Sequence, residues 1–162
     1  MSQSTQLYLS SEADTKRLAA CFAAHMAVAD VVLLNGGLAA GKTFFVAAAA
    51  AALGSTVAVT SPTYTIANIY PAPFGPIVHI DAYRLENASE FEDLALEDLL
   101  ETGVAFIEWG AGLADEFDAW VSLELMPDPA KAGARHAVLA ASGQRGKTML
   151  AQVLAAFQGA KA

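Results

Sequence analysis

Eight consecutive residues, Gly36 to Thr43, have the types and the spacing of a phosphate-binding loop. They read Gly-Gly-Leu-Ala-Ala-Gly-Lys-Thr and fit the P-loop pattern of a glycine, any four residues, then Gly-Lys and a hydroxyl residue. In such a loop, backbone N–H groups at the start of a helix surround the phosphates, the lysine reaches the outer phosphates and the hydroxyl ligates Mg²⁺. The pattern therefore predicts a site for a nucleoside triphosphate and Mg²⁺. Its predicted binding residues are Gly36, Leu38, Ala39, Ala40, Gly41, Lys42 and Thr43.

The flanking residues supply the elements that such a loop needs. Val31–Asn35 is short, apolar and β-branched, which predicts a strand, and residues 44–53 are alanine-rich and end at Gly54, which predicts a helix. A second Gly-Lys-Thr at residues 146–148 has Ala141 where the first glycine should stand. We therefore predict a single phosphate loop.

Two acidic residues each follow a predicted buried strand. Asp81 comes directly after residues 77–80, and Glu108 comes directly after residues 104–107. A P-loop enzyme needs a carboxylate near Mg²⁺, at the carboxyl end of a strand, to hold the metal or orient water. We predict that Asp81 and Glu108 share these two roles, and the residues alone do not assign them.

Two further features each have two interpretations. Residues 61–65, Ser-Pro-Thr-Tyr-Thr, offer three hydroxyls in a proline-stiffened turn, which is either a nucleotide-sensing switch or a plain turn. Trp109, after Glu108, either stacks on a base or a partner or is an ordinary core or rim aromatic.

Charge limits the kinds of partner. The 162 residues carry a net charge of -8, which opposes direct binding of DNA or RNA because such binding needs a surplus of Lys and Arg. Residues 81–118 hold 12 of the 17 acids and only one basic residue, Arg84. This run is either a solvated helix face or an acidic docking surface for a partner.

The remaining pattern predicts one domain over residues 1–162 with a mixed α/β sheet. Further strands are predicted at residues 6–9, 56–60, 64–70, 77–80, 104–107, 120–125 and 136–140. Further helices are predicted from Ser11 through Met26, at 89–101 and at 147–157, with a turn at 71–76.

No apolar run approaches the roughly 20 residues that span a bilayer, so we expect no membrane segment. The N-terminus is polar, and the lone Cys21 fits a reducing compartment. Together these features predict a cytoplasmic protein.

Four blocks of this chain resemble the bacterial TsaE ATPases (the YjeE type) of tRNA threonylcarbamoyladenosine synthesis. The blocks are Asn35–Thr43, Ser61–Thr65, His79–Leu85 and Ile107–Trp109, in family order and spacing over nearly the whole chain. The second and third blocks are more specific than the P-loop.

The resemblance implies a three-layer P-loop NTPase-like fold with a mixed parallel and antiparallel sheet. It implies an ATPase that binds ATP and Mg²⁺ and works with TsaB and TsaD proteins, which would contact the tRNA in its place. It further implies that Lys42 holds phosphates, that Thr43 and Glu108 serve Mg²⁺, and that Asp81 lies at the catalytic centre. The implied switch or partner-sensing residues are Ser61, Thr63, Tyr64 and Trp109.

The loop departs from the family pattern Gly-Asp-Leu-Gly-Ala-Gly-Lys-Thr-Thr at Gly37, Ala39 and Phe44. If position 39 needs a positive φ, its Cβ costs of order 1 kcal/mol. Two alternative functions are a small-molecule kinase and a non-hydrolysing, nucleotide-gated docking module. The widely spaced arginines oppose the kinase, and the absence of an Asn-Lys-any-Asp motif opposes a GTPase.

Overall fold

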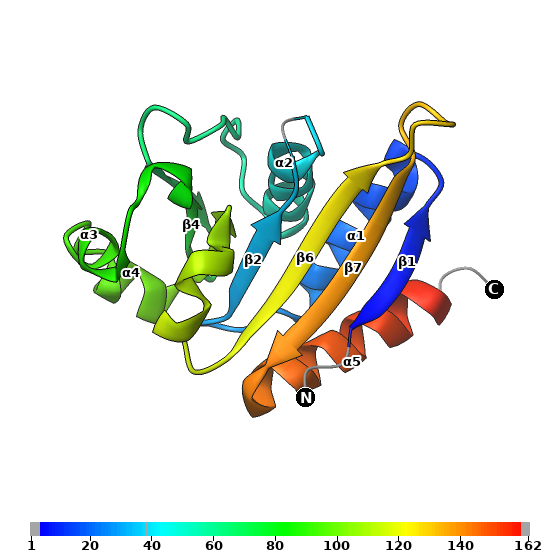
Figure 1. Ribbon diagram of the computed structural model, residues 1–162. Helices are drawn as coiled ribbons and strands as arrows, with labels where there is room; N and C mark the ends of the chain where they lie inside the picture. The colour runs from blue at the N-terminus through cyan, green and yellow to red at the C-terminus, as the bar shows by residue number, and fades with distance from the viewer. Residues whose placement is uncertain (1–3, 38, 160–162) are drawn as a thin grey trace.

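A mixed β-sheet forms the centre of the protein (Figure 1). The computed structural model describes residues 4–37 and 39–159, and within them seven strands join in the order β1-β7-β6-β2-β5-β4-β3. Strand β2 is parallel to β5 and β6, and β4 is parallel to β5, whereas β1, β7 and β3 pair antiparallel. The strands are β1 (Thr5–Leu9), β2 (Val31–Asn35), β3 (Ala67–Ala72), β4 (Gly75–Asp81), β5 (Val104–Glu108), β6 (Trp120–Pro127) and β7 (Arg135–Ser142).

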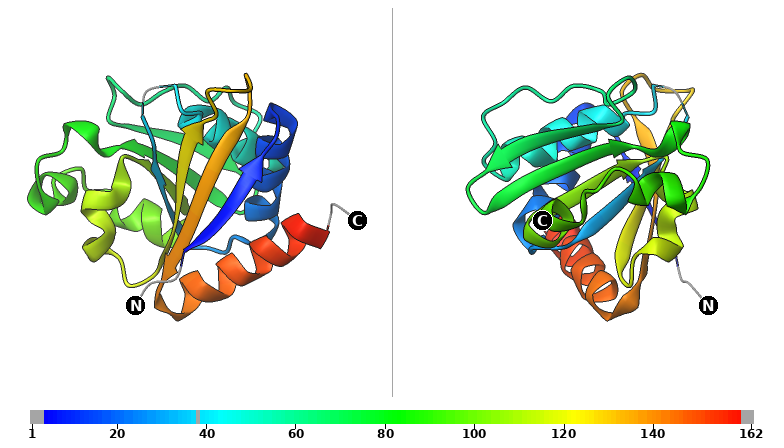
Figure 2. Two further views of the ribbon diagram at one scale, coloured as in Figure 1. Left: turned by 45° about the vertical axis from the view of Figure 1, so that its right-hand side comes forward. Right: turned by 90° about the vertical axis from the view of Figure 1, so that its left-hand side faces the viewer.

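Helices cover both faces of this sheet and make three layers (Figures 1 and 2). One face packs against α1 (Glu12–His25), α2 (Lys42–Ala52) and α5 (Gly143–Gly159). The other packs against α3 (Ala88–Glu92), α4 (Glu97–Thr102) and the 3₁₀ helix η2 (Gly110–Glu116), and a shorter 3₁₀ turn, η1 (Ala82–Arg84), follows β4. Alternate residues of β2 face the two helical layers. Val32 and Leu34 belong to the first core, and Val31 and Leu33 belong to the second. The predicted fold class is confirmed.

The helix behind the P-loop is anchored by one aromatic side chain. Phe45 is fully buried and meets Phe22 of α1 edge-on, with ring centroids 5.3 Å apart, and Phe106 of β5 at 6.4 Å. The small side chains of Ala49 and Ala50 are also buried in this core. Because this core fixes α2 against β5, the start of α2 lies beside the end of that strand.

Two strand predictions and one turn prediction need correction around the prolines. Residues 56–60 form no strand, because the backbone N–H and C=O of Thr60 bond to the Tyr70 hydroxyl instead of to a strand. The strand predicted at 64–70 begins at Ala67, and the turn predicted at 71–76 is mostly strand. Pro71 and Pro76 face each other across β3 and β4. Because β3 is the edge strand, proline costs it no sheet hydrogen bond on its open side.

The helix predicted at 89–101 is two helices, α3 and α4. Ala95 takes a left-handed φ of 55° between them, and this break lets both Phe91 and Leu96 reach the second core. The first helix begins after Ser11, whose side chain accepts a hydrogen bond from the Asp14 amide. The last helix begins four residues early, at Gly143. The strands predicted at 6–9, 77–80, 104–107, 120–125 and 136–140 are all present.

Candidate functional site

The P-loop connects β2 to α2 at the carboxyl end of the parallel strands (Figure 1). Its first and last glycines have positive φ, 145° at Gly36 and 106° at Gly41, and Gly41 is the N-cap of α2. A Cβ on Gly36 would stand 2.5 Å from the carbonyl oxygen of Leu125 in β6, so only glycine fits there. Ala39 has a positive φ of 61°, the conformation in which its Cβ strains the backbone. Leu38 lies outside the described residues.

Lys42 lies across the loop with its amine held by loop carbonyls. Its Nζ donates to the oxygens of Gly36 at 2.7 Å and Gly37 at 3.0 Å, and the side chain is buried. Nζ also lies 4.2 Å from the centroid of the Trp109 ring. Burial lowers the pKa of the Lys42 ammonium, while the carboxylates of Glu108 and Asp81 oppose that shift.

Strand pairing brings the two predicted acids side by side. Asp81 of β4 and Glu108 of β5 are partners in the sheet register, so both side chains leave the same face, the one that α2 covers. Each is 5% exposed. Glu108 Oε2 accepts from the hydroxyl of Thr43 at 3.0 Å. Asp81 instead accepts from the backbone N–H of Tyr83 at 3.0 Å and caps η1.

The hydroxyl of Thr43 and the carboxylate of Glu108 are a donor pair that suits Mg²⁺. Both are hard oxygen ligands, and Mg²⁺ in nucleotide sites is held by one or two protein oxygens together with phosphates and water. Among residues 4–37 and 39–159, no group of three or more His, Cys, Asp and Glu side chains could hold a metal without such help. The pair therefore fits a metal that arrives with a nucleotide.

Trp109 follows Glu108 in a left-handed conformation, with φ 60°. Its backbone N–H donates to the oxygen of Leu34 at 2.7 Å, and its ring lies against the amine of Lys42. The ring also contacts that of Tyr83, which is 71% exposed; the ring centroids are 5.3 Å apart and the planes are tilted by 51°. Trp109 is thus a rim aromatic next to the P-loop lysine, a position that suits contact with a nucleotide or a partner.

The hydroxyl-rich segment 61–65 lies on the surface between α2 and β3. Ser61 and Thr63 share a hydrogen bond of 2.6 Å between their side chains, and Arg84 donates to the backbone oxygen of Thr63 at 3.2 Å. Tyr64 is 88% exposed. The residue directly after the segment is tied to the site, because the backbone N–H of Asp81 donates to the oxygen of Ile66 at 2.8 Å. Both interpretations of this segment remain predictions.

Two buried residues of this site were not predicted to have a role. His79 is fully buried and hydrogen-bonds through Nε2 to Glu108 Oε2 at 2.5 Å and through Nδ1 to the Tyr70 hydroxyl at 2.9 Å. One signal was available, because His79 is two residues before Asp81 in a strand and so faces the same side. Tyr70 carried no signal of its own.

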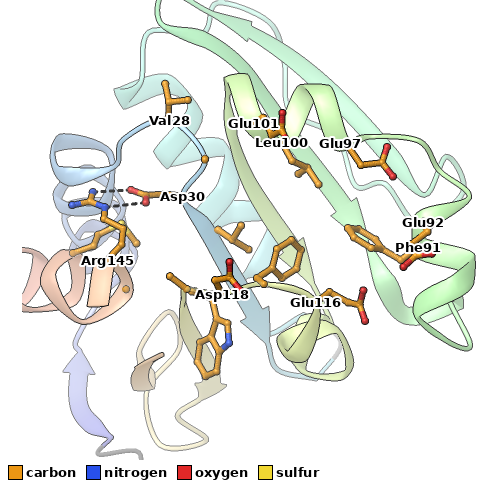
Figure 3. A pocket seen from close by; sticks show the side chains of 17 residues that line it. Val28, Asp30, Phe91, Glu92, Glu97, Leu100, Glu101, Glu116, Asp118 and Arg145 are labelled. Atoms are coloured by element: carbon orange, nitrogen blue, oxygen red, sulfur yellow. Dashed lines mark hydrogen bonds and ion pairs between the residues drawn. The ribbon is translucent and has the colours of Figure 1, made fainter. Parts of the chain in front are cut away.

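A cavity of about 660 Å³ lies at the opposite end of the sheet, where β2 and β6 begin (Figure 3). Five exposed carboxylates line it, those of Glu92, Glu97, Glu101, Glu116 and Asp118. Its one guanidinium, Arg145, is bonded to Asp30 through Nε at 3.0 Å and Nη2 at 2.8 Å. These carboxylates would repel a triphosphate, so this cavity is not the nucleotide site.

No helix within the described residues is both long and apolar enough to cross a membrane.

Comparison with known proteins identifies the family. A family model described as threonylcarbamoyl adenosine biosynthesis protein TsaE matches residues 9–137. A TsaE protein of Streptomyces coelicolor is 39% identical over 133 residues, which cover 78% of this chain and 89% of the relative. A TsaE protein of Rickettsia bellii is 39% identical over 106 residues, which cover 65% of this chain and 74% of the relative.

A solved structure has the same fold. The crystal structure of Bacillus subtilis YdiB superposes with a TM-score of 0.74 at 24% identity and covers 94% of this chain and 95% of its own. At that identity the likeness concerns the fold. The sequence matches and the family model together place the chain in a family: it belongs to the TsaE proteins of threonylcarbamoyladenosine biosynthesis.

Proposed function

We propose that this chain is a Mg²⁺-dependent ATPase that supports threonylcarbamoyladenosine modification of tRNA together with TsaB and TsaD proteins. The observation that carries the proposal is the 3.0 Å contact between Thr43 and Glu108 at the start of α2, beside Lys42 of the P-loop. The charge of -8 supports an indirect role at the tRNA, since partners would then supply the contacts to its phosphates.

Each site residue has a task that follows from its position. The loop amides and the amine of Lys42 would bind the phosphates, with Lys42 exchanging the oxygens of Gly36 and Gly37 for phosphate oxygens. Thr43 and Glu108 would hold Mg²⁺, which offsets the negative charge that develops on the transferred phosphoryl group. Asp81, beside Glu108 in the sheet register, would orient the attacking water.

The test begins with calorimetric titration of ATP and of GTP, each with Mg²⁺, into the wild type and two lysine variants. Lys42→Ala should abolish binding. Lys147→Ala is its matched control, because Gly146-Lys147-Thr148 repeats the end of the motif in α5, where Lys147 is exposed. Hydrolysis is then measured for Glu108→Gln with and without TsaB, TsaD and tRNA.

We expect ATP to bind more tightly than GTP and hydrolysis to be lost in Glu108→Gln. Hydrolysis that survives Glu108→Gln would refute the metal assignment. A phosphorylated small-molecule product in a substrate screen would instead favour the kinase alternative. Nucleotide binding without any hydrolysis, even with the partners and tRNA present, would favour the docking module.

A further inference from the structure

A continuous chain of hydrogen bonds, buried between Tyr70 and Glu108, links Thr60 to Glu108. Thr60, the residue before segment 61–65, donates its N–H to the Tyr70 hydroxyl at 3.3 Å, and its C=O lies 3.0 Å from the same hydroxyl. The Tyr70 hydroxyl meets His79 Nδ1 at 2.9 Å, and His79 Nε2 meets Glu108 Oε2 at 2.5 Å. We call Thr60, Tyr70, His79 and Glu108 the relay.

The donor and the acceptor of the hydrogen bond between His79 and Glu108 can be assigned. An ionised carboxylate can only accept hydrogen bonds. His79 Nε2 therefore carries the hydrogen and donates the hydrogen bond to Glu108. The same oxygen also accepts from Thr43. Two donors from different elements, β4 and α2, therefore fix one oxygen of Glu108, and the imidazole orients the carboxylate that is proposed to hold Mg²⁺.

Burial makes the relay costly to break. His79 is 0% exposed, Tyr70 4% and Glu108 5%, so their hydrogen bonds are not replaced by water when they lengthen. Both ring nitrogens of His79 are engaged, and the ring cannot turn without losing a partner. A displacement of the Tyr70 hydroxyl is therefore passed to His79.

The other end of the relay is exposed and held by side chains. Asn68 Nδ2 donates to the backbone oxygen and to the hydroxyl of Thr60, both at 3.2 Å. No strand ladder fixes Thr60, and the next residue, Ser61, is exposed. Movement of segment 61–65 can thus pull Thr60 away from Tyr70 without unfolding the sheet.

We propose that Tyr70 and His79 are positioning residues that couple the conformation of segment 61–65 to the orientation of Glu108. The inference rests on the proposed function, because Glu108 matters here as a ligand of nucleotide-bound Mg²⁺. It predicts that occupancy of the metal site orders the surface segment, and that loss of the relay uncouples the two.

The test is Tyr70→Phe, which keeps the ring and removes only the hydroxyl. Tyr8→Phe is the matched control, since it also removes a tyrosine hydroxyl that donates a hydrogen bond, here to Asp128. Tyr8 lies on β1, which β7, β6 and β2 separate from β5 in the sheet. For each protein we would measure ATP binding in EDTA, the Mg²⁺ concentration that gives half-maximal hydrolysis, and amide hydrogen exchange of residues 61–65 with and without Mg²⁺ and ATP.

In Tyr70→Phe we expect unchanged ATP binding in EDTA, about a tenfold higher half-saturating Mg²⁺ concentration, and loss of the protection that Mg²⁺ and ATP confer on residues 61–65. Tyr8→Phe should match the wild type. In a Glu108→Gln background, Tyr70→Phe should leave the residual Mg²⁺ dependence of ATP binding unchanged. If Tyr70→Phe fails to fold, Asn68→Ala loosens the exposed Thr60 end and should shift the Mg²⁺ dependence in the same direction.

The outcomes separate the two proposals. If the wild type does not bind Mg²⁺ and ATP, both the proposed function and the proposed coupling through the relay are overturned. A wild type that is active, with a Tyr70→Phe variant that shows the same Mg²⁺ dependence and the same protection, would overturn the relay alone. An equal loss of ATP affinity with and without Mg²⁺ would show a merely structural role and also overturn it.

Discussion

Replacing Gly36 with alanine would put a methyl group where the backbone of β6 already stands. The new Cβ would lie 2.5 Å from the carbonyl oxygen of Leu125 and 2.9 Å from the Cβ of Ala40. The first neighbour is backbone in the middle of a paired strand, so it cannot move aside cheaply. The φ of 145° at position 36 adds strain for any residue with a Cβ.

The magnitude follows from these two contributions. Forcing a methylene-sized group into a filled space costs about 1–3 kcal/mol. A non-glycine residue in this backbone region costs about 1–3 kcal/mol more. We therefore expect Gly36→Ala to lower the free energy of unfolding by roughly 2–6 kcal/mol, a large share of the roughly 5–15 kcal/mol that holds a typical domain folded. ATP binding should fall with it, because relief requires the loop to shift.

The neighbouring glycine is a matched control. A Cβ on Gly37 would meet nothing within 4 Å, and its φ is not positive. We expect Gly37→Ala to change the free energy of unfolding by about 0.5 kcal/mol or less. Urea unfolding followed by circular dichroism measures both variants, and ATP titration reports on the loop. Equal urea midpoints for the two variants would refute the steric argument.

Three further predictions concern stability. Ala39→Gly should raise the free energy of unfolding by about 1 kcal/mol, because φ is 61° there, and an unchanged or lower urea midpoint would contradict this. Hydrogen bonds from Ser10 lower the pKa of the Asp14 carboxyl, so its contribution is present above about pH 4 and is lost as pH falls through the lowered value. Asp14→Asn should therefore lower the free energy of unfolding in urea by about 1 kcal/mol at pH 7 and by much less at pH 3. An equal loss at the two pH values would show that the charge of the Asp14 carboxylate is not the source of the stabilisation. Arg145→Ala should cost about 2 kcal/mol, because it leaves the 5% exposed side chain of Asp30 without its cation, and the Asp30→Asn, Arg145→Ala double variant should recover part of that loss.

Errors in the predicted elements arose where tertiary contacts compete with local preference. Proline at 71 and 76 indicated a turn, yet both residues lie in strands. Pro71 is in the edge strand β3, which tolerates a missing N–H, and Pro76 stands one residue before the pairing of β4 with β5 begins at Ile77. Residues 56–60 have the composition of a strand, but the Tyr70 hydroxyl takes the hydrogen bonds of Thr60 that a neighbouring strand would need. The strands β2, β4 and β5 were predicted correctly. Both of their faces are buried, so each is a continuous apolar run that is easy to recognise in the sequence.

The sequence by itself determined the phosphate loop, because all of its parts are contiguous and their spacing is the geometry: the glycines supply the turn and α2 begins at Lys42. It also marked Asp81 and Glu108 as acids at strand ends. Only the tertiary structure decided which acid meets Thr43, since Glu108 is 65 residues away from it and is placed by the register of β5 against β2 and by the packing of α2. The same holds for His79, whose partner Glu108 lies 29 residues away. Spacing along the chain fixes local geometry, whereas contacts between strands depend on pairing that no short motif encodes.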